Sequence, residues 1–475
     1  MLFEERSDSF IYYPSGESVT CKEINHIAQK LTWIYLKLRT DSSKSRPFCF
    51  SASSKYTSKW IAACWVSGIP FFVIPQNPSR EIISLIQDYI NPIAQFSDLG
   101  DDYCLSDASC ERIYCHQIQE SPLARLMSSS LDDICGYMMT SGTSGTPKIA
   151  IIKRKNIIQA ALSAGENVQP GISNRWLLML PLNHIGGQSV ILRSIIYGNS
   201  ISDFRFEKLN RIADELVLNW EVTMTSMVPT QLHKLLEVPD FKTHDEFKAI
   251  LLGGGPSSTE MILEARKRKI PIMKSYGMTE TTAQFTCVPI NSIFNADPLS
   301  SGVPLPGNKI QIRDSNKIVL EHGESGLIYL KGPQVIDEYL YPKEANHAFD
   351  EKGWFYTGDY GHIDAKGNLY VEMRRSDLII TGGENVSPVK VENALLKLPK
   401  VKDVAVIGVE DSVWGQKLVA LVVVDDKHFA PDVWTDALKA DLSNFEVPRE
   451  FKQIDTLPKN DLGKLIRSKL IELAV

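Results

Sequence analysis

The sequence of 475 residues lacks the features that would place it in a membrane or in an oxidising compartment. Its eight cysteines include no CxxC pair, and the spacing of Cys104, Cys110 and Cys115 matches no recognised metal site. The longest stretch without charge, residues 60–79, is interrupted by three prolines and cannot form a spanning helix. The opening letters MLFEERSD carry charges where a signal peptide has its apolar core. We expect reduced thiols, no membrane insertion and a cytoplasmic location.

An excess of positive charge is also missing. The chain has 51 basic and 57 acidic residues, so its net charge of −6 gives no electrostatic reason to expect a nucleic acid partner. The basic run at residues 266–269 closes a predicted helix, where cations favour the negative end of the helix dipole. We interpret it as a solvated helix end. Hydrophobic residues make up 43% of the chain, which is ordinary for a globular protein of several domains.

Apolar periodicity predicts alternating helices and strands in the first part of the chain. This alternation is typical of a mostly parallel α/β sheet. The predicted helices cover 22–38, 59–66, 81–89, 207–218 and 259–267, and the predicted strands cover 71–74, 136–140, 149–153, 176–180, 250–252 and 271–274. Ser257 is predicted to cap the helix over 259–267.

The pattern changes near residue 308 to short strands with frequent glycine and aspartate, which indicates a small β-rich unit. About 100 residues follow Arg375, enough for a separate compact domain. The predicted fold is therefore α/β. It has a large N-terminal α/β body with a β-rich subdomain over residues 1–374, and a small mobile α+β C-terminal lid domain over residues 375–475.

The most informative segment is MTSGTSGTPK at residues 139–148. Its glycines let backbone N–H groups turn toward an anion, its hydroxyls add donors, and its lysine adds positive charge. These groups predict a polyphosphate guest, although the segment is not a Walker loop, because no GxxxxGK[ST] occurs in the chain. A flexible Ser/Thr/Gly linker is the alternative that composition alone leaves open.

A second segment, SYGMTE at residues 275–280, directly follows a predicted strand. The carboxyl end of a parallel strand is where α/β sheets place ligands. Here Tyr276 is suited to stack on a base, and Glu280 is suited to hold a divalent cation that bridges phosphates. The alternative is a plain turn whose glutamate caps the next helix.

Three shorter segments carry weaker signals. The letters YTGD at 356–359 predict a turn whose aspartate accepts two ribose hydroxyls, although such turns are common by chance. The paired glycines within 373–385 fit a hinge between domains, with a plain hairpin as the alternative, and Ser387 before Pro388 predicts a helix start. Lys464, on a glycine turn near the C-terminus, means nothing by itself.

Taken together, the order and spacing of these segments resemble the adenylate-forming superfamily, which comprises acyl-CoA synthetases, firefly-type luciferases and non-ribosomal adenylation domains. The resemblance covers essentially the whole chain. Residues 140–148 resemble the family's phosphate loop, 276–280 its adenine and magnesium segment, and 356–359 its ribose turn. Arg374 is similar to its ribose-contacting arginine and Lys464 to its adenylation lysine.

The resemblance implies ATP, Mg²⁺ and coenzyme A as cofactor and cosubstrates. A carboxylate attacks the α-phosphate of ATP, the small domain rotates, and a thiol attacks the resulting acyl-adenylate. The catalytic residues implied are Lys464, His184, Thr140 and Glu280, with Glu280 and Thr140 as the ligands of Mg²⁺. The nucleotide and CoA residues implied are Ser141, Gly142, Thr143, Ser144, Gly145, Lys148, Gly253, Gly254, Gly255, Pro256, Ser275, Tyr276, Gly277, Met278, Thr279, Asp359, Arg374, Gly382 and Gly383.

The acid is indicated by a finer resemblance to o-succinylbenzoate–CoA ligases of menaquinone synthesis. It rests on the letters ILLGGGP, KSYGMTETTAQ and RRSDLIITGGENVSP. His184 resembles the residue that borders the acyl pocket, and a satisfied structural histidine is the alternative. The polar letters Asn183, His184 and Gln188 suit a substrate with a second carboxylate, although Asn183 departs from the aromatic residue common in such ligases. Ile149, in place of a usual glycine, and Ser376 at the hinge are further departures.

Three functions remain open from the sequence. The first is a CoA ligase acting on o-succinylbenzoate or on another aryl or medium-chain acid. The second is a stand-alone adenylation enzyme that loads an aryl or fatty acid onto a carrier protein. The third, a catalytically silent nucleotide-binding protein, is disfavoured by the intact Lys464, Glu280 and Asp359. A homodimer is expected only by analogy with the family.

Overall fold

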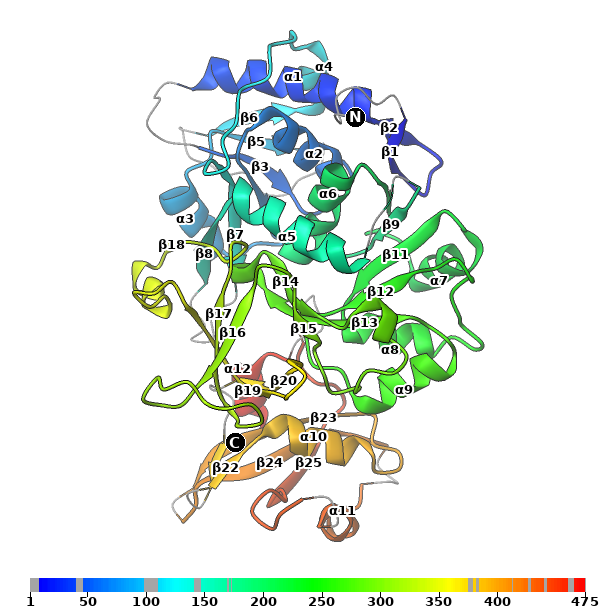
Figure 1. Ribbon diagram of the computed structural model, residues 1–475, viewed down its shortest axis with the longest axis vertical. Helices are drawn as coiled ribbons and strands as arrows, with labels where there is room; N and C mark the ends of the chain where they lie inside the picture. The colour runs from blue at the N-terminus through cyan, green and yellow to red at the C-terminus, as the bar shows by residue number, and fades with distance from the viewer. Residues whose placement is uncertain are drawn as a thin grey trace.

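The structure is a computed structural model. It describes residues 8–39, 46–97, 110–140, 147–168, 171, 173–374, 379–381, 384–411, 413–425, 429–439, 442–459 and 465–474. Within these residues the N-terminal body contains two large sheets with helices between and outside them, followed by a β-rich unit and a C-terminal α+β unit (Figure 1). The predicted α/β fold class is confirmed.

The first large sheet carries the predicted phosphate loop between two of its strands. It combines parallel neighbours with antiparallel pairs at the β18 edge. In spatial order its strands are β18 (Tyr339–Tyr341), β8 (Lys148–Lys153), β7 (Ile134–Thr140), β4 (Phe71–Ile74), β3 (Phe48–Ser51), β5 (Ala94–Ser97) and β6 (Glu111–Tyr114). The strands predicted at 71–74, 136–140 and 149–153 are therefore present.

The second large sheet is parallel through its middle. In spatial order its strands are β15 (Val303–Pro304), β14 (Ala283–Cys287), β13 (Ile272–Met278), β12 (Ala249–Leu252), β11 (Val222–Met227), β9 (Arg175–Leu178), β10 (Ser200–Asp203), β1 (Ser9–Tyr12) and β2 (Ser18–Thr20). Strand β13 pairs in parallel with β12 as far as Lys274 and then in antiparallel with β14 from Ser275 onward. The strand predicted to end at Lys274 therefore continues to Met278, because β14 returns alongside it.

The helices of the body pack on these two sheets through three hydrophobic cores. A shared hydrophobic core, with side chains from both sheets, encloses α1 (Cys21–Leu38), α2 (Thr57–Ser67), α5 (Arg154–Val168) and α6 (Ile185–Tyr197). A second core buries α7 (Leu209–Leu218), α8 (Pro229–Leu236) and α9 (Thr259–Lys267) against the outer face of the parallel sheet. A third joins α3 (Arg80–Leu85), with its π-helical extension Ile86–Ile90, to the first sheet. The short α4 spans Cys115–Glu120.

The β-rich unit predicted after residue 308 is an antiparallel sheet. Its strands are β16 (Lys309–Arg313), β17 (Gly326–Lys331), β19 (Phe355–Ile363) and β20 (Leu369–Arg374). Residues 356–359, predicted as a turn, lie inside β19 instead, and only Gly358 there has a positive φ, of 78°. The prediction was wrong because TGD letters report a local turn preference, whereas pairing with β17 and β20 decides the backbone.

The C-terminal unit has its own sheet and lies below the β-rich unit in Figure 1. Its strands are β22 (Glu384–Val386), β21 (Ile379–Thr381), β24 (Gly415–Val423), β23 (Asp403–Asp411) and β25 (Glu450–Gln453). One face packs on α10 (Pro388–Leu396) and α11 (Pro431–Leu438), and the other on α12 (Arg467–Ala474). Ser387 caps α10 with Pro388 at its first position, as predicted.

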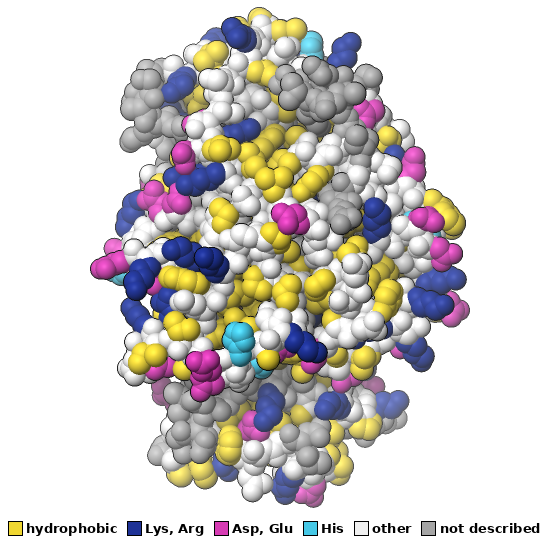
Figure 2. Space-filling view, viewed as in Figure 1, with side chains coloured by type: hydrophobic (Ala, Val, Ile, Leu, Met, Phe, Trp, Pro, Cys, Tyr) yellow, Lys and Arg dark blue, Asp and Glu magenta, His cyan; other side chains and the backbone are white. Residues whose placement is uncertain are grey.

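The described residues include no helix with the length and apolar character that crossing a bilayer requires. On the face shown in Figure 2, basic and acidic side chains are interspersed around the edge. The predicted basic run closes α9, whose last turn contains Arg266 and Lys267. Arg266 donates to the backbone oxygens of Ile293 and Ala296, and Arg268 donates to Glu264. Two cations of this run therefore bind neighbouring protein groups.

Two adjacent serines precede α9, and only the second of them caps the helix. Ser258 accepts a hydrogen bond from the backbone N–H of Met261 through its hydroxyl, whereas the buried Ser257 hydroxyl has no partner among the described residues. The predicted cap at Ser257 was therefore wrong by one residue.

We expect Ser258→Ala to cost about 1 kcal/mol of stability, because the N-terminal backbone N–H of α9 loses its hydrogen-bond acceptor. Ser257→Ala, the matched control, should leave the urea unfolding midpoint nearly unchanged. Equal losses in the two variants would contradict the assignment of the cap.

Candidate active site

The predicted site residues fall into two groups. The residues Ser141, Gly142, Thr143, Ser144, Gly145, Gly382, Gly383 and Lys464 lie outside the described residues. For Arg374 the backbone is described, and it pairs with Asp359 across β20 and β19. Strands β21 and β22, which flank the predicted hinge glycines, pair with each other in antiparallel fashion. The remaining predicted residues can be placed by their contacts.

The two ends of the predicted phosphate loop face each other across a strand pair. Thr140 ends β7, Lys148 begins β8, and the two residues are partners in the ladder. Ile149, which departs from the family pattern, is fully buried in the core beside α3. The departure therefore contributes to the core of the sheet and leaves both ends of the loop anchored.

Lys148 and Glu280 both contact Tyr339, a residue that the sequence analysis did not identify. The Lys148 ammonium lies 5.2 Å from the centre of the Tyr339 ring, within the range of a cation–π interaction. The hydroxyl of the same tyrosine donates to Oε1 of Glu280 at 2.7 Å. Glu280 is 9% exposed and Tyr339 only 1% exposed. The letters YLY at 339–341 suggest a strand, but nothing in the sequence indicates that this strand pairs with β8.

The short turn that holds Glu280 is followed by unusual backbone. Thr282 and Ala283 have positive φ values of 52° and 82°, and a β-branched residue such as threonine is rarely found there. Buried hydrogen bonds hold this geometry: the Thr282 hydroxyl donates to the Gln334 oxygen at 2.8 Å, and the Gln334 amide donates to the Thr281 oxygen at 2.7 Å. Strain of this kind persists only where surrounding contacts over-determine it, commonly at functional sites.

The predicted base-stacking and ribose residues are in direct contact. The Tyr276 hydroxyl donates to Oδ2 of Asp359 at 2.6 Å, and Asp359 is 4% exposed. The backbone N–H of Asp359 donates to the Thr357 hydroxyl at 3.0 Å, which fixes the strand at this point. Two segments far apart in the sequence, 275–280 and 356–359, therefore form one site.

The glycine turn after β12 lies against the same strand. A Cβ at Gly253 would come within 2.8 Å of the Ser275 hydroxyl, which itself donates to the Leu252 oxygen at 3.1 Å. Gly254 has a φ of 82°, where a side chain is strained. The absence of a side chain at Gly253 therefore lets the turn approach Ser275, the residue before Tyr276.

His184 stands at the N-cap of α6, shortly after β9 of the same sheet. Its Nε2 lies 3.2 Å from Nδ2 of Asn183. Gln188, predicted as part of a polar acid pocket, instead donates its amide to the Leu182 oxygen at 2.7 Å and is 3% exposed. The Gln188 amide therefore fixes the start of α6.

Sequence reasoning also missed Arg193 on α6. Its guanidinium lies 4.9 Å from the centre of the Trp176 ring and is 4% exposed. Burial lowers its pKa to about 10, and neither Nε nor Nη1 has a hydrogen-bond partner among the described residues. Buried cations of this kind are costly unless they are paired, and the contact with the Trp176 ring offsets part of this cost. An arginine within the apolar letters VILRSII was the available signal.

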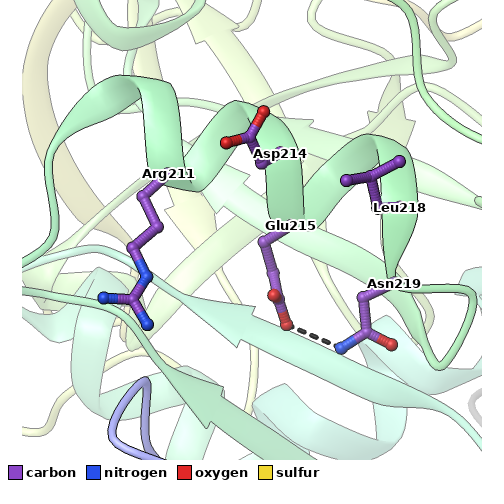
Figure 3. A pocket seen from close by; sticks show the side chains of 5 residues that line it. All are labelled: Arg211, Asp214, Glu215, Leu218 and Asn219. Carbon is purple, nitrogen blue, oxygen red and sulfur yellow. Dashed lines mark hydrogen bonds between the residues drawn. The ribbon is translucent and has the colours of Figure 1, made fainter.

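A surface depression elsewhere carries no such chemistry. It has a volume of about 440 Å³ and is lined by Arg211, Asp214, Glu215, Leu218 and Asn219, all from α7 or its end (Figure 3). Glu215 accepts a hydrogen bond from the Asn219 amide at 2.7 Å. None of the predicted site residues lines it, and its spacing is that of an ordinary exposed helix face.

The tight approach at Gly277 gives a direct test of the site's backbone. A Cβ there would lie 1.8 Å from the carbonyl oxygen of Ala283, a rigid neighbour. We expect Gly277→Ala to lower stability by about 1–3 kcal/mol because the two strands must separate. Gly255→Ala is the matched control, because its nearest neighbour would be Pro229 Cδ at 3.9 Å. Thermal unfolding of both variants distinguishes them, and an unchanged Gly277→Ala midpoint would refute the close approach.

Family models and similar known sequences all indicate the same family. A family model described as AMP-binding enzyme matches residues 96–340, and one described as AMP-binding enzyme C-terminal domain matches residues 390–464. A 2-succinylbenzoate–CoA ligase from Bacillus subtilis is 37% identical over 393 residues, covering 79% of each chain. The corresponding ligase from Listeria monocytogenes serovar 1/2a is 36% identical, covering 72% of this chain and 70% of its own.

Solved structures agree with the sequence comparison. O-succinylbenzoate coenzyme A synthetase (MenE) from Bacillus subtilis, in complex with ATP and magnesium ion, aligns with a TM-score of 0.87 at 30% identity, covering 97% of this chain and 96% of that chain. The same enzyme in complex with the acyl-adenylate intermediate OSB-AMP aligns with a TM-score of 0.87 at 29% identity, covering 97% and 95%. ATP-bound MatB from Rhodopseudomonas palustris, at 22% identity with a TM-score of 0.90, covers 99% of this chain and 96% of that chain and shares the fold. The chain therefore belongs to the AMP-binding enzyme family, the adenylate-forming enzymes that include the 2-succinylbenzoate–CoA ligases.

Proposed function

We propose that this chain is an AMP-forming acid–CoA ligase that activates 2-succinylbenzoate with ATP and transfers the acyl group to CoA. The observation that carries the proposal is that contacts join separate predicted nucleotide segments. Tyr339 contacts both Lys148 and Glu280. Tyr276 donates to Asp359, and Gly253 lies against Ser275. The family membership and the names of the similar ligases support it.

The phosphate end of the nucleotide belongs, in this proposal, beside Lys148 and Glu280. The Glu280 carboxylate is a hard oxygen ligand of the kind Mg²⁺ takes, and Thr140 at the facing strand end offers a hydroxyl. Bound there, Mg²⁺ would neutralise phosphate charge as the carboxylate approaches. Lys148, with Ser141 and Thr143 of the loop, would hold the β- and γ-phosphates. Lys464 would bridge the carboxylate and the α-phosphate, which lowers the barrier where negative charge accumulates.

The nucleoside belongs beside Tyr276. Its ring would stack on adenine next to the glycine turn at Gly253–Gly255, while Asp359 accepts the ribose hydroxyls and Arg374 contacts the ribose. The hydrogen bond from Tyr276 to Asp359 orients the carboxylate before the nucleotide arrives. Preorganisation of this kind reduces the free energy spent on ordering during binding.

In this proposal 2-succinylbenzoate binds beside Arg193, the cation buried in the N-terminal body. 2-Succinylbenzoate carries two carboxylates, of which one reacts and the other needs a partner. The unpaired N–H groups of Arg193 supply that partner, while His184 at the start of the same helix orients the reacting carboxylate or gates the pocket.

In this proposal the C-terminal residues serve both half-reactions. We propose residues 1–374 as the adenylation domain and 375–475 as a rotating lid that carries Lys464. After rotation, Gly382 and Gly383 would line the entry path of the thiol without side-chain obstruction. A carrier protein as acceptor, the homodimer and the cytoplasmic location remain predictions from the sequence.

The proposed function is tested by pyrophosphate release from ATP with 2-succinylbenzoate, with and without CoA, and by mass analysis of the products. We expect pyrophosphate and 2-succinylbenzoyl-CoA. Release that stops at the adenylate when CoA is present would point to a carrier protein as acceptor. If no pyrophosphate is released, the substrate assignment fails, and aryl and medium-chain acids come next.

Arg193 gives a sharper test of the substrate. Arg193→Met should raise the KM for 2-succinylbenzoate about 10²-fold, because the second carboxylate loses its only proposed cation. The control is 4-oxo-4-phenylbutanoate, which lacks the ring carboxylate and should lose much less activity. Similar losses with both acids would indicate a structural role and remove Arg193 from substrate recognition.

A further inference from the structure

We infer that Tyr339 is a positioning residue of the phosphate and magnesium site, acting through Glu280 and Lys148. The inference rests on the proposed function, since it assigns a task to the groups expected to bind Mg²⁺–ATP. None of the sequence motifs includes Tyr339. It comes from a separate strand, β18, that pairs with β8 at the edge of the first sheet (Figure 1).

Tyr339 contacts both charged groups through different parts of its side chain. Its hydroxyl donates to Oε1 of Glu280 at 2.7 Å, while its ring faces the Lys148 ammonium at 5.2 Å from the ring centre. The ion pairs of the described residues do not include one between Lys148 and Glu280. The tyrosine thus contacts two opposite charges at once, the carboxylate through its hydroxyl and the ammonium through its ring.

The tyrosine itself is held rigidly. Its backbone N–H donates to Oδ1 of Asn346 at 2.7 Å, and its backbone oxygen accepts from Nδ2 of the same residue at 3.2 Å. The ring lies 6.1 Å from the ring of Phe349, centre to centre, and is almost fully buried. A side chain fixed at both backbone groups and by packing can define where Glu280 and Lys148 stand.

The backbone of Glu280 and of the residue that follows it is hydrogen-bonded to the same segment. The Ile336 N–H donates to the Glu280 oxygen at 2.9 Å, and Gln334 binds the backbone of Thr281. Residues 334–339 therefore fix both the main chain and the carboxylate of the proposed metal ligand. Second-shell partners of this kind orient metal ligands, and losing them typically costs 10–100-fold in metal affinity.

Tyr339→Phe isolates the hydroxyl, because phenylalanine keeps the ring beside Lys148. We expect the variant to bind Mn²⁺ in the presence of ATP about 10–100-fold more weakly than the unmodified protein, measured by the free Mn²⁺ signal in electron paramagnetic resonance. Tyr341→Phe is the matched control. It removes a hydroxyl from the same strand, but its ring packs on Tyr89 in a different hydrophobic cluster, and its Mn²⁺ affinity should be unchanged.

A double-mutant cycle shows whether Tyr339 acts through Glu280. In a Glu280→Gln background, Tyr339→Phe should change Mn²⁺–ATP affinity less than twofold, because the carboxylate it orients is gone. An effect as large as in the native background would mean that Tyr339 acts through general packing, and would overturn the inference. Metal-free ATP binding by Tyr339→Phe should stay near normal, since Lys148 keeps its ring.

The outcomes separate this inference from the proposed function. If the unmodified protein binds no Mn²⁺–ATP, both fail. If it binds normally and Tyr339→Phe binds equally well, only the inference fails. Should the phenylalanine variant not fold, 3-fluorotyrosine placed at position 339 keeps the hydroxyl. Its ¹⁹F resonance should then shift on addition of Mg²⁺–ATP beyond the shift with ATP alone, and identical shifts would overturn the inference.

Discussion

The arrangement of the site depends on strand β13, which extends beyond the end of its parallel partner β12. Strand β13 pairs with β12 as far as Lys274 and then continues with β14 as a new, antiparallel partner. The change of partner carries Tyr276 to Asp359 and Glu280 to Tyr339, so both carboxylates meet groups from distant parts of the chain. It also requires Gly277, because the Ala283 carbonyl lies where a side chain would begin.

Both carboxylates of the site are buried and both accept a hydrogen bond from a tyrosine. A buried ionised carboxylate is expensive unless hydrogen bonds or cations compensate it. Asp359 and Glu280 receive neutral phenol donors, which satisfy part of each carboxylate without cancelling its charge. For Glu280, that charge is what the proposed Mg²⁺ would bind. Arg193 presents the complementary situation, a buried cation whose Nε and Nη1 have no hydrogen-bond partner among the described residues.

Local patterns predicted the secondary structure well where one physical signal dominates. The apolar run at 71–74 is strand β4, the span 259–267 is helix α9, and Ser387–Pro388 starts α10, because hydrophobic periodicity and capping act over a few residues. The errors arose where two local solutions compete. Adjacent serines both suit the cap of α9, and YTGD suits either a turn or the strand it forms. Neither choice can be made without knowing what packs alongside.

The sequence by itself determined the family and the α/β class, because the order and spacing of its motifs resemble those of the adenylate-forming superfamily, and it predicted most of the groups that surround the nucleotide in the proposed site. Only the tertiary structure decided how these groups are held. Tyr339 reaches Glu280 and Lys148 because β18 pairs with β8, and Arg193 is buried against Trp176 because α6 packs between two sheets. Such contacts join residues far apart in the chain. Strand pairing and helix packing bring these residues together, and the local sequence around each one does not indicate which distant residue it will contact.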